Sequence, residues 1–333
     1  MRYRTLGKTG LSVSELAMGG LFVSRLGGPR DEARRAVRRA FDLGVNYVDT
    51  CPNYLDSEAA LGVALEGETR PCILSTKLAA RWQDGETLPF DPQDPAALRR
   101  SVSESLELLG RDQIDILMIH EPDRPGQYDF FSDHTAYTGP VCRVLDDLKA
   151  EGIIRFTGLG GTTAYELPPI IDTGVYDVVL TAFNYSLLWR EAAIEVLPAA
   201  KRQGMGIIVG SPLQQGALAR RYDDEVNGGA RWMSSPRRAQ YQALYALLDE
   251  LDMPLAELAL RFVLSNPDIS CTLMGARSVW EIEANVAAAE RGPLPDDVLA
   301  RLDEIAAMVP FRPFEEPFGL PFGRERSGPF RAR

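Results

Sequence analysis

Four side chains that could move protons stand at the ends of short apolar segments in the first half of the sequence. Asp49 and Tyr54 follow one such segment, Lys77 closes the next, and His120 closes the one after that. A free phenol has a pKa of about 10, so Tyr54 needs a nearby charge to exchange protons readily. Lys77 held by Asp49 could supply that charge, while His120 orients a carbonyl oxygen. This set suits interconversion of a carbonyl and an alcohol, provided that a cofactor carries the hydride.

The scarcity of two residue types strengthens this interpretation. The chain uses arginine for most of its positive charge and has four lysines, Lys8, Lys77, Lys149 and Lys201, and two histidines, His120 and His134. A lysine offers a compact charge whose pKa can shift, which an arginine does not. The structural alternatives are a solvated strand end for Lys77 and a hydrogen-bonded core histidine for His120.

The positions of these residues follow from a regular alternation of strands and helices. Eight units are expected, with strands at 16–18, 47–48, 72–74, 114–119, 153–159, 178–183, 207–209 and 271–274. Regular alternation requires a parallel sheet, and eight units favour a (β/α)8 TIM barrel formed by one domain spanning 1–333. An open doubly wound sheet is the alternative, but the glycines at 158–161 do not form its Gly-x-Gly-x-x-Gly motif. In a barrel, all strands end at the same face, so the four side chains would meet there.

Other segments would complete the barrel. Residues 1–10 alternate in polarity and are expected to form an N-terminal β-hairpin. Segments 120–138 and 211–235 and the extended C-terminal tail, 310–333, show no helical or strand period. Because long irregular segments often carry binding sites, we expect them to form the walls of the substrate pocket.

Composition excludes several classes of protein. The 333 residues are 45% hydrophobic and 25% charged, with a net charge of -11, which argues against nucleic acid or an anionic membrane as a partner. The four cysteines form no Cys-x-x-Cys pair, and the histidines are too few for a zinc site, so no metal is expected. No signal peptide or membrane span is evident, and we expect a cytoplasmic protein. Whether it forms a homo-oligomer is left open.

In order and spacing, the four residues resemble the catalytic tetrad of the aldo-keto reductases. The resemblance rests on Asp49-Thr50, Tyr54 with Ser57-Glu58, Ser75-Thr76-Lys77 and His120, and it covers nearly the whole chain. It implies a (β/α)8 barrel closed below by a hairpin, and an extended nicotinamide cofactor, NAD(P)(H), bound without a Rossmann fold. It also implies that Tyr54 is the general acid/base, that Lys77 and Asp49 tune it, and that His120 orients the carbonyl.

The resemblance extends to three cofactor-binding regions. It implies a glycine turn near the nicotinamide ribose, a Ser-Pro-Leu loop over the pyrophosphate, and a segment at the start of the last barrel helix that holds the adenosine end. The residues concerned are Gly19, Gly20, Asp49, Gly160, Gly161, Ser211, Leu213, Gly216, Leu218, Gly275, Arg277, Ser278, Glu281 and Asn285.

The chain departs from the common pattern of the family at three places. Gly160-Gly161 replaces the Ser-Asn pair that holds the carboxamide, and Thr162 or Thr163 could substitute. Gly210 replaces the aromatic residue that stacks on the nicotinamide. Glu281 stands where NADP(H)-preferring members carry a positive or amide side chain, and a carboxylate there would repel a 2′-phosphate. This favours NAD, although Arg277 could still pair with a phosphate.

The glycine substitutions at 160, 161 and 210, together with segments 119–123 and 158–163, most resemble the branch that includes D-threo-aldose 1-dehydrogenase and L-galactose dehydrogenase. Those enzymes oxidise the anomeric hydroxyl of a free sugar to a lactone with NAD(P). We therefore expect a sugar or similar aldehyde as the small-molecule substrate. Two alternatives stay open, namely a broad-specificity NADPH-dependent aldehyde or ketone reductase and a cofactor-sensing regulatory subunit of the potassium-channel β type.

Overall fold

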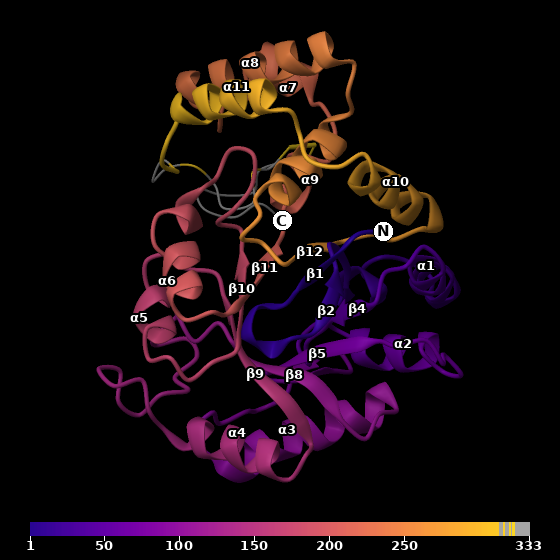
Figure 1. The fold of residues 1–333 in the computed structure, drawn as a ribbon, viewed down its shortest axis with the longest axis vertical. Coiled ribbons are helices and arrows are strands. Elements are labelled where there is room, and N and C mark those ends of the chain that lie inside the picture. Colours follow the sequence, from indigo (N-terminus) through magenta and orange to yellow (C-terminus); the bar gives the residue numbers. More distant parts are fainter. Residues whose placement is uncertain (313–315, 317–319, 321, 324–333) are drawn as a thin grey trace.

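Eight parallel strands form a closed barrel at the centre of the computed structural model (Figure 1). The structure describes residues 1–312, 316, 320, 322 and 323. The strands are β3 (Leu16–Gly19), β4 (Tyr47–Asp49), β5 (Ile73–Leu78), β8 (Ile114–His120), β9 (Ile154–Gly161), β10 (Val178–Ala182), β11 (Gly206–Gly210) and β12 (Cys271–Met274). They adjoin one another in chain order, and β12 pairs with β3 to close the ring. The predicted (β/α)8 fold is confirmed, and closure excludes the doubly wound sheet.

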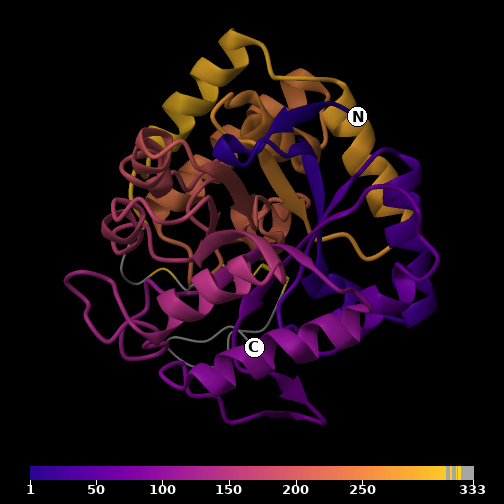
Figure 2. The same cartoon turned by 60° about the horizontal axis from the view of Figure 1, so that its bottom comes forward.

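Helices surround the barrel and return the chain from the end of one strand to the start of the next. They are α1 (Arg30–Asp42), α2 (Ser57–Ala64), α3 (Pro95–Leu109), α4 (Pro140–Ala150), α5 (Leu167–Ile171), α6 (Val196–Arg202), α7 (Asp223–Gly228), α8 (Ser235–Leu251), α9 (Leu255–Ser265), α10 (Val279–Glu290) and α11 (Asp296–Ala307). Helices α3 and α4 lie side by side on one flank (Figure 2). The short antiparallel pair β6 (Trp82–Gln83) and β7 (Glu86–Thr87) follows β5 outside the barrel.

The strands are apolar on both faces because each face is buried. In β8, Ile116 and Met118 belong to the core inside the barrel, whereas Leu117 and Ile119 pack under the helices. Successive side chains of a strand point to opposite faces, so a strand with two buried faces reads as a continuous apolar run. Local signals also set the helix ends. The carboxylate of Asp94, for example, caps α3 by accepting from the backbone nitrogens of its first turn.

The N-terminal hairpin is longer than the predicted segment 1–10. It pairs β1 (Tyr3–Thr5) with β2 (Ser12–Ser14). The stretch Gly7–Thr9 is a turn of 3-10 helix, and Gly10 follows with a φ of 70°, so these residues connect the strands and do not form the second one. The Lys8 nitrogen donates to the Gly204 carbonyl at 2.7 Å, just before β11 begins. The hairpin therefore lies at the N-terminal end of the barrel, opposite the strand ends that carry the candidate tetrad.

Two helices were not predicted from the sequence. Helix α7 lies within the segment 211–235 that was expected to be irregular, and α11 follows the last barrel helix. Helix α11 buries Val298, Leu302, Ile305 and Ala306, which recur at helical spacing. Figure 1 shows α11 beside α8, so it extends the outer layer of helices.

Most of the predicted tail, 310–333, lies outside the described residues, but Arg312 does not. Its guanidinium lies 3.7 Å from the centre of the Trp189 ring and donates to the carbonyl oxygen of Phe183, directly after β10. Farther along, Glu316 forms a buried ion pair with Arg237 of α8. The described part of the tail therefore reaches the C-terminal end of the barrel. None of the helices in the described part of the chain is long and apolar enough to cross a membrane.

Candidate active site

An ion pair between Lys77 and Asp49 forms the centre of the candidate site. Lys77 lies in β5, Asp49 ends the neighbouring β4, and both side chains are almost completely buried. The ammonium donates to Asp49 Oδ1 at 2.8 Å, to Oδ2 at 2.7 Å and to the Thr50 carbonyl oxygen at 2.7 Å. Acceptors therefore surround the buried charge, as its stability requires. Burial opposes the charge on Lys77, but the attraction and hydrogen bonding of Asp49, together with the nearby Tyr54 and Cys51, raise the pKa of the ammonium.

Tyr54 lies beside this ion pair, on the loop that follows β4. The ammonium nitrogen of Lys77 is 5.1 Å from the centre of the phenol ring. Burial raises the pKa of Tyr54, and the positive charge of Lys77 is the strongest nearby charge that opposes this rise. The phenol thus keeps its proton next to a fixed positive charge that would stabilise the phenolate. Such a group can donate a proton and recover it.

His120 completes the group from the end of β8. Its ring centre is 6.2 Å from that of Tyr54, with the two ring planes at 84°. Burial, followed by the positive charges of Lys77 and Arg124, lowers the pKa of His120 to about 3. The imidazole is therefore neutral near pH 7, with one nitrogen that donates and one that accepts. The structure thus brings together all four residues predicted from the sequence.

Two hydroxyl groups that the sequence interpretation missed hold Asp49 in place. The Tyr47 hydroxyl donates to Ser75 Oγ at 2.9 Å, and Ser75 Oγ donates to Asp49 Oδ1 at 2.6 Å. Tyr47 and Asp49 are two residues apart in β4, as are Ser75 and Lys77 in β5. Residues two apart in a strand share a face, so the alternation of side chains was the signal that could have identified them.

The predicted cofactor-binding segments lie at the same end of the barrel as the four candidate residues. The loops after β11 and β12 and the turn after β3 follow three neighbouring strands, and β4, β5 and β8 come next in the ring. Carboxyl ends of parallel strands share one face, where barrels of this type place their ligands. An extended ligand could therefore run from the start of α10 to Tyr54.

The loop after β11 has an unusual backbone. Ser211, Gln214 and Gln215 have φ values of 55°, 49° and 54°, and Gly216 follows with 104°. Residues other than glycine rarely adopt such backbone angles, and the residues that do adopt them are concentrated in ligand-binding loops and active sites. Gln214 is buried and donates to Ser186 Oγ at 2.7 Å, which fixes the loop. This shape is compatible with the predicted contact to a pyrophosphate.

The segment after β12 ends at a capped helix. Ser278 Oγ accepts from the Glu281 nitrogen at the start of α10. The Glu281 carboxylate accepts from the Arg277 backbone nitrogen at 2.6 Å and from its guanidinium at 2.9 Å. A helix N-terminus attracts anions, and α10 presents its own at the ligand face. Arg277, which the sequence interpretation considered as a phosphate partner, is therefore already paired with Glu281.

Several of the predicted cofactor residues have packing roles. A Cβ at Gly20 would lie 2.7 Å from the Asp49 carbonyl oxygen, and one at Gly161 would lie 2.7 Å from the Leu167 side chain. Leu218 is fully buried in the core. Gly160 has more space, because a Cβ there would lie 3.5 Å from Lys77 Cε. Three other predicted residues, Gly19, Gly275 and Asn285, are partly or fully exposed at the same end of the barrel.

The residues proposed to replace the missing Ser-Asn pair are held by a carboxylate. The backbone nitrogens of Thr162 and Thr163 donate to Asp123 Oδ2 at 2.7 and 2.5 Å, and Asp123 is buried. The Thr162 hydroxyl donates to Glu121 at 3.3 Å. The Thr163 hydroxyl is the more available of the two for a carboxamide contact.

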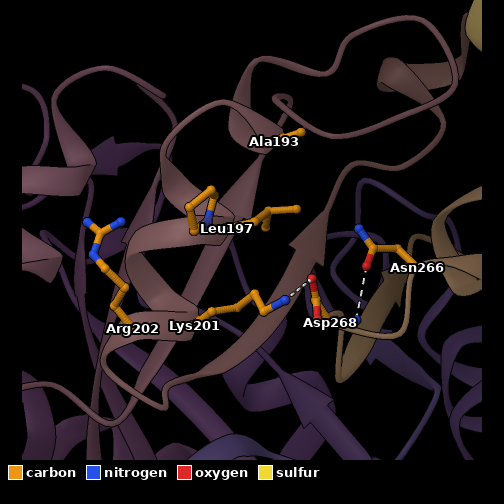
Figure 3. A pocket seen from close by; sticks show the side chains of 7 residues that line it. Ala193, Leu197, Lys201, Arg202, Asn266 and Asp268 are labelled. Carbon is orange, nitrogen blue, oxygen red and sulfur yellow. Dashed lines mark hydrogen bonds and ion pairs between the residues drawn. The ribbon is translucent and has the colours of Figure 1, made fainter.

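The structure also has a surface pocket of about 430 Å³ (Figure 3). Lys201 and Arg202 at the end of α6 line it, with Asn266 and Asp268 before β12. Lys201 donates to Asp268 Oδ2 at 2.8 Å. Helix ends and strand starts meet at the N-terminal end of the barrel, so the pocket does not belong to the candidate site. In the part of the chain that the structure describes, no cluster of His, Cys, Asp and Glu could hold a metal ion.

Comparison with known proteins identifies the family. Residues 15–307 match the Aldo/keto reductase family, and the chain belongs to it. The chain is 33% identical to L-galactose dehydrogenase of Arabidopsis thaliana over 295 residues, which cover 86% of the chain and 87% of that protein. It is 29% identical to the NADH-specific methylglyoxal reductase of Escherichia coli (86% and 93% covered) and 28% identical to D-threo-aldose 1-dehydrogenase of a Pseudomonas species (90% and 96% covered).

A solved structure supports the same assignment. The holo form of aldo-keto reductase AKR11C1 from Bacillus halodurans superposes with a TM-score of 0.75 at 28% identity, covering 92% of this chain and 96% of that one. The chain is therefore an oxidoreductase of the aldo-keto reductase type, and both relatives named in the predicted branch are among its homologues. The family uses nicotinamide cofactors.

Proposed function

We propose that the protein oxidises a free aldose or a similar sugar at its anomeric carbon to a lactone, with Asp49, Tyr54, Lys77 and His120 as the catalytic group. The observation that carries this proposal is the position of the Tyr54 phenol, 5.1 Å from a buried ammonium whose charge Asp49 secures. A nicotinamide cofactor, when bound, accepts or donates the hydride. During reduction the Tyr54 phenol gives its proton to the carbonyl oxygen, and during oxidation its phenolate form takes the proton of the hydroxyl group. Lys77 stabilises the phenolate, and the neutral His120 donates to the reacting oxygen.

The substrate class is supported by the relatives and by the polarity around the site. L-galactose dehydrogenase and D-threo-aldose 1-dehydrogenase are sugar dehydrogenases by name. Glu121 follows His120 in the sequence, and its side chain is partly exposed. A carboxylate suits a polyhydroxylated substrate better than an apolar aldehyde.

Reduction of a small aldehyde is the second candidate function, and the methylglyoxal reductase relative favours it. The two candidates share the same four residues and differ in substrate and direction. For either one, we propose a preference for NAD(H) over NADP(H), because Glu281 would repel a 2′-phosphate. The NADH-specific name of that relative agrees with this preference.

The test is formation of reduced nicotinamide when the purified protein receives NAD or NADP with a panel of free aldoses. Turnover with NAD and one stereochemical class of aldose, lost in Tyr54→Phe, is the expected result. Consumption of NADH or NADPH with simple aldehydes, together with no reaction on any sugar, would replace the first candidate by the second. Tight nucleotide binding without turnover on either panel would contradict both and favour the regulatory-subunit alternative.

A further inference from the structure

Asn53 lies against the only histidine of the candidate site. It stands between Pro52 and Tyr54, and its amide nitrogen Nδ2 is 3.4 Å from Nδ1 of His120. With the amide in this orientation, its nitrogen donates and cannot accept, so the Nδ1 atom that it faces offers a lone pair. A neutral imidazole with a lone pair on Nδ1 carries its proton on Nε2.

We propose that Asn53 is a positioning residue that selects the Nε2–H tautomer of His120, so that the ring donates a hydrogen bond to the substrate oxygen. This inference rests on the proposed function and adds a residue to it. With the opposite tautomer, Nε2 would present a lone pair to a carbonyl oxygen, which is repulsive. A second group that accepts no proton from Nδ1 therefore favours the tautomer in which His120 acts as a donor.

The loop that carries Asn53 is held firmly enough for this role. The Tyr54 nitrogen donates to the Cys51 carbonyl at 3.0 Å, and the Trp82 nitrogen donates to the Pro52 carbonyl at 3.1 Å. Cys51 and Pro52 are both buried. Backbone hydrogen bonds on either side of Asn53 thus limit its movement, as the placement of a supporting side chain requires.

The imidazole is enclosed by groups that do not choose the tautomer themselves. Tyr54 meets it edge-on, and the Tyr128 ring centre lies 6.1 Å away with its plane tilted by 41°. Lys77 from β5 and Arg124 from the loop after β8 both disfavour a second proton on the ring. Glu121, the next residue, pairs with Arg124 and contacts Thr162. Among the described residues, Asn53 is the one whose hydrogen bond reaches a ring nitrogen.

The substitution Asn53→Asp tests the proposal, because it keeps the shape of the side chain and reverses the hydrogen bond. A carboxylate accepts, so Nδ1 must become the donor and Nε2 loses its proton. We expect kcat/KM for carbonyl reduction near pH 7 to fall by about 10- to 100-fold, the loss that follows when a buried hydrogen-bond partner is left unmatched. Below the pKa of the new carboxylate–imidazole pair, the ring is doubly protonated and donates again from Nε2. Activity of Asn53→Asp should therefore recover as the pH falls, which the wild type should not show.

Nitrogen NMR of histidine-labelled protein gives a readout that does not depend on activity. The chain has two histidines, and the exposed His134 provides the reference signal and can be removed by His134→Gln. The expected wild-type spectrum shows His120 protonated on Nε2 alone near pH 7, and Asn53→Asp shifts the proton to Nδ1. A wild-type ring protonated on Nδ1, or an Asn53→Asp ring still protonated only on Nε2, would overturn the proposal.

Activity and spectra separate the two proposals. If the wild type has no turnover with any substrate, the proposed function fails, while the spectra still decide what Asn53 does. The variant Asn53→Ala serves as the comparison, because it removes the amide without imposing a tautomer. Its spectrum should show both tautomers, and a pure Nε2–H ring there would show that Asn53 is not needed.

Discussion

The substitution Lys77→Met should destabilise the protein strongly, apart from its effect on turnover. Asp49 and Lys77 are 2% and 1% exposed in their side chains, and the ammonium makes three contacts at 2.7–2.8 Å. Without Lys77, Asp49 keeps the hydrogen bond from Ser75 to Oδ1, but its charge is left buried without a counterion. Removing one partner of a buried ion pair lowers the free energy of unfolding by about 3–5 kcal/mol. Removing both charges in Asp49→Asn/Lys77→Met should restore at least about 2 kcal/mol of that loss.

The measurement is urea unfolding of the wild type, both single variants and the double variant, followed by circular dichroism. Lys201→Met is the matched control, because Lys201 pairs with Asp268 on the surface at 55% and 33% exposure. The substitution Lys201→Met should lower the free energy of unfolding by no more than about 1 kcal/mol. The double variant should regain stability but no turnover. The buried-pair reasoning is refuted if Lys77→Met unfolds within about 1 kcal/mol of the wild type, or if the double variant is no more stable than Lys77→Met.

Three further predictions concern single residues. Tyr54→Phe should lower kcat by about 10²- to 10⁴-fold while nucleotide affinity, measured by fluorescence titration, stays close to wild type; a wild-type rate would remove Tyr54 from its role. Glu281→Gln should improve binding of NADP(H) relative to NAD(H) by about fivefold, since it removes a repulsive charge and frees Arg277; an unchanged ratio of dissociation constants would contradict this. His120, with its pKa lowered to about 3, binds a proton more weakly when folded than when unfolded, so it contributes stability above pH 6.5 that is lost as the pH falls towards 3. Between pH 7.5 and about pH 5, unfolding experiments should show the wild type losing about 2 kcal/mol more than His120→Gln, with His134→Gln as a control that behaves like the wild type.

The fold and the four central residues could be predicted because both depend on local patterns. Apolar runs define the strands, and parallel strands bring their carboxyl ends to one face whatever the details of packing. Asp49, Lys77 and His120 stand at or next to the ends of β4, β5 and β8, which are neighbours in the barrel. Their meeting therefore follows from topology.

Features that depend on tertiary contacts could not be predicted in the same way. The contact between Asn53 and His120 joins the loop after β4 to the end of β8, and no spacing in the sequence indicates it. The second strand of the hairpin was missed because Thr9-Gly10 is the turn and not its end. Gly20 and Gly161 match cofactor positions by resemblance, yet the Asp49 carbonyl oxygen already excludes a side chain at Gly20, and a side chain at Gly161 would displace that of Leu167. Sequence alone does not separate a glycine required by a ligand from one required by packing.

The arrangement of charges explains why this site needs its one buried lysine. Asp49 has two opposite effects, because it keeps Lys77 charged but also raises the pKa of Tyr54 by repulsion. The effect of Lys77 on the phenol exceeds that of Asp49, since the ammonium faces the ring at 5.1 Å while Ser75 donates to the carboxylate. The strongest single charge acting on Tyr54 is therefore positive, although the whole chain carries a charge of -11. An ammonium offers this charge at one small nitrogen, whereas the guanidinium of an arginine would spread it over a larger planar group.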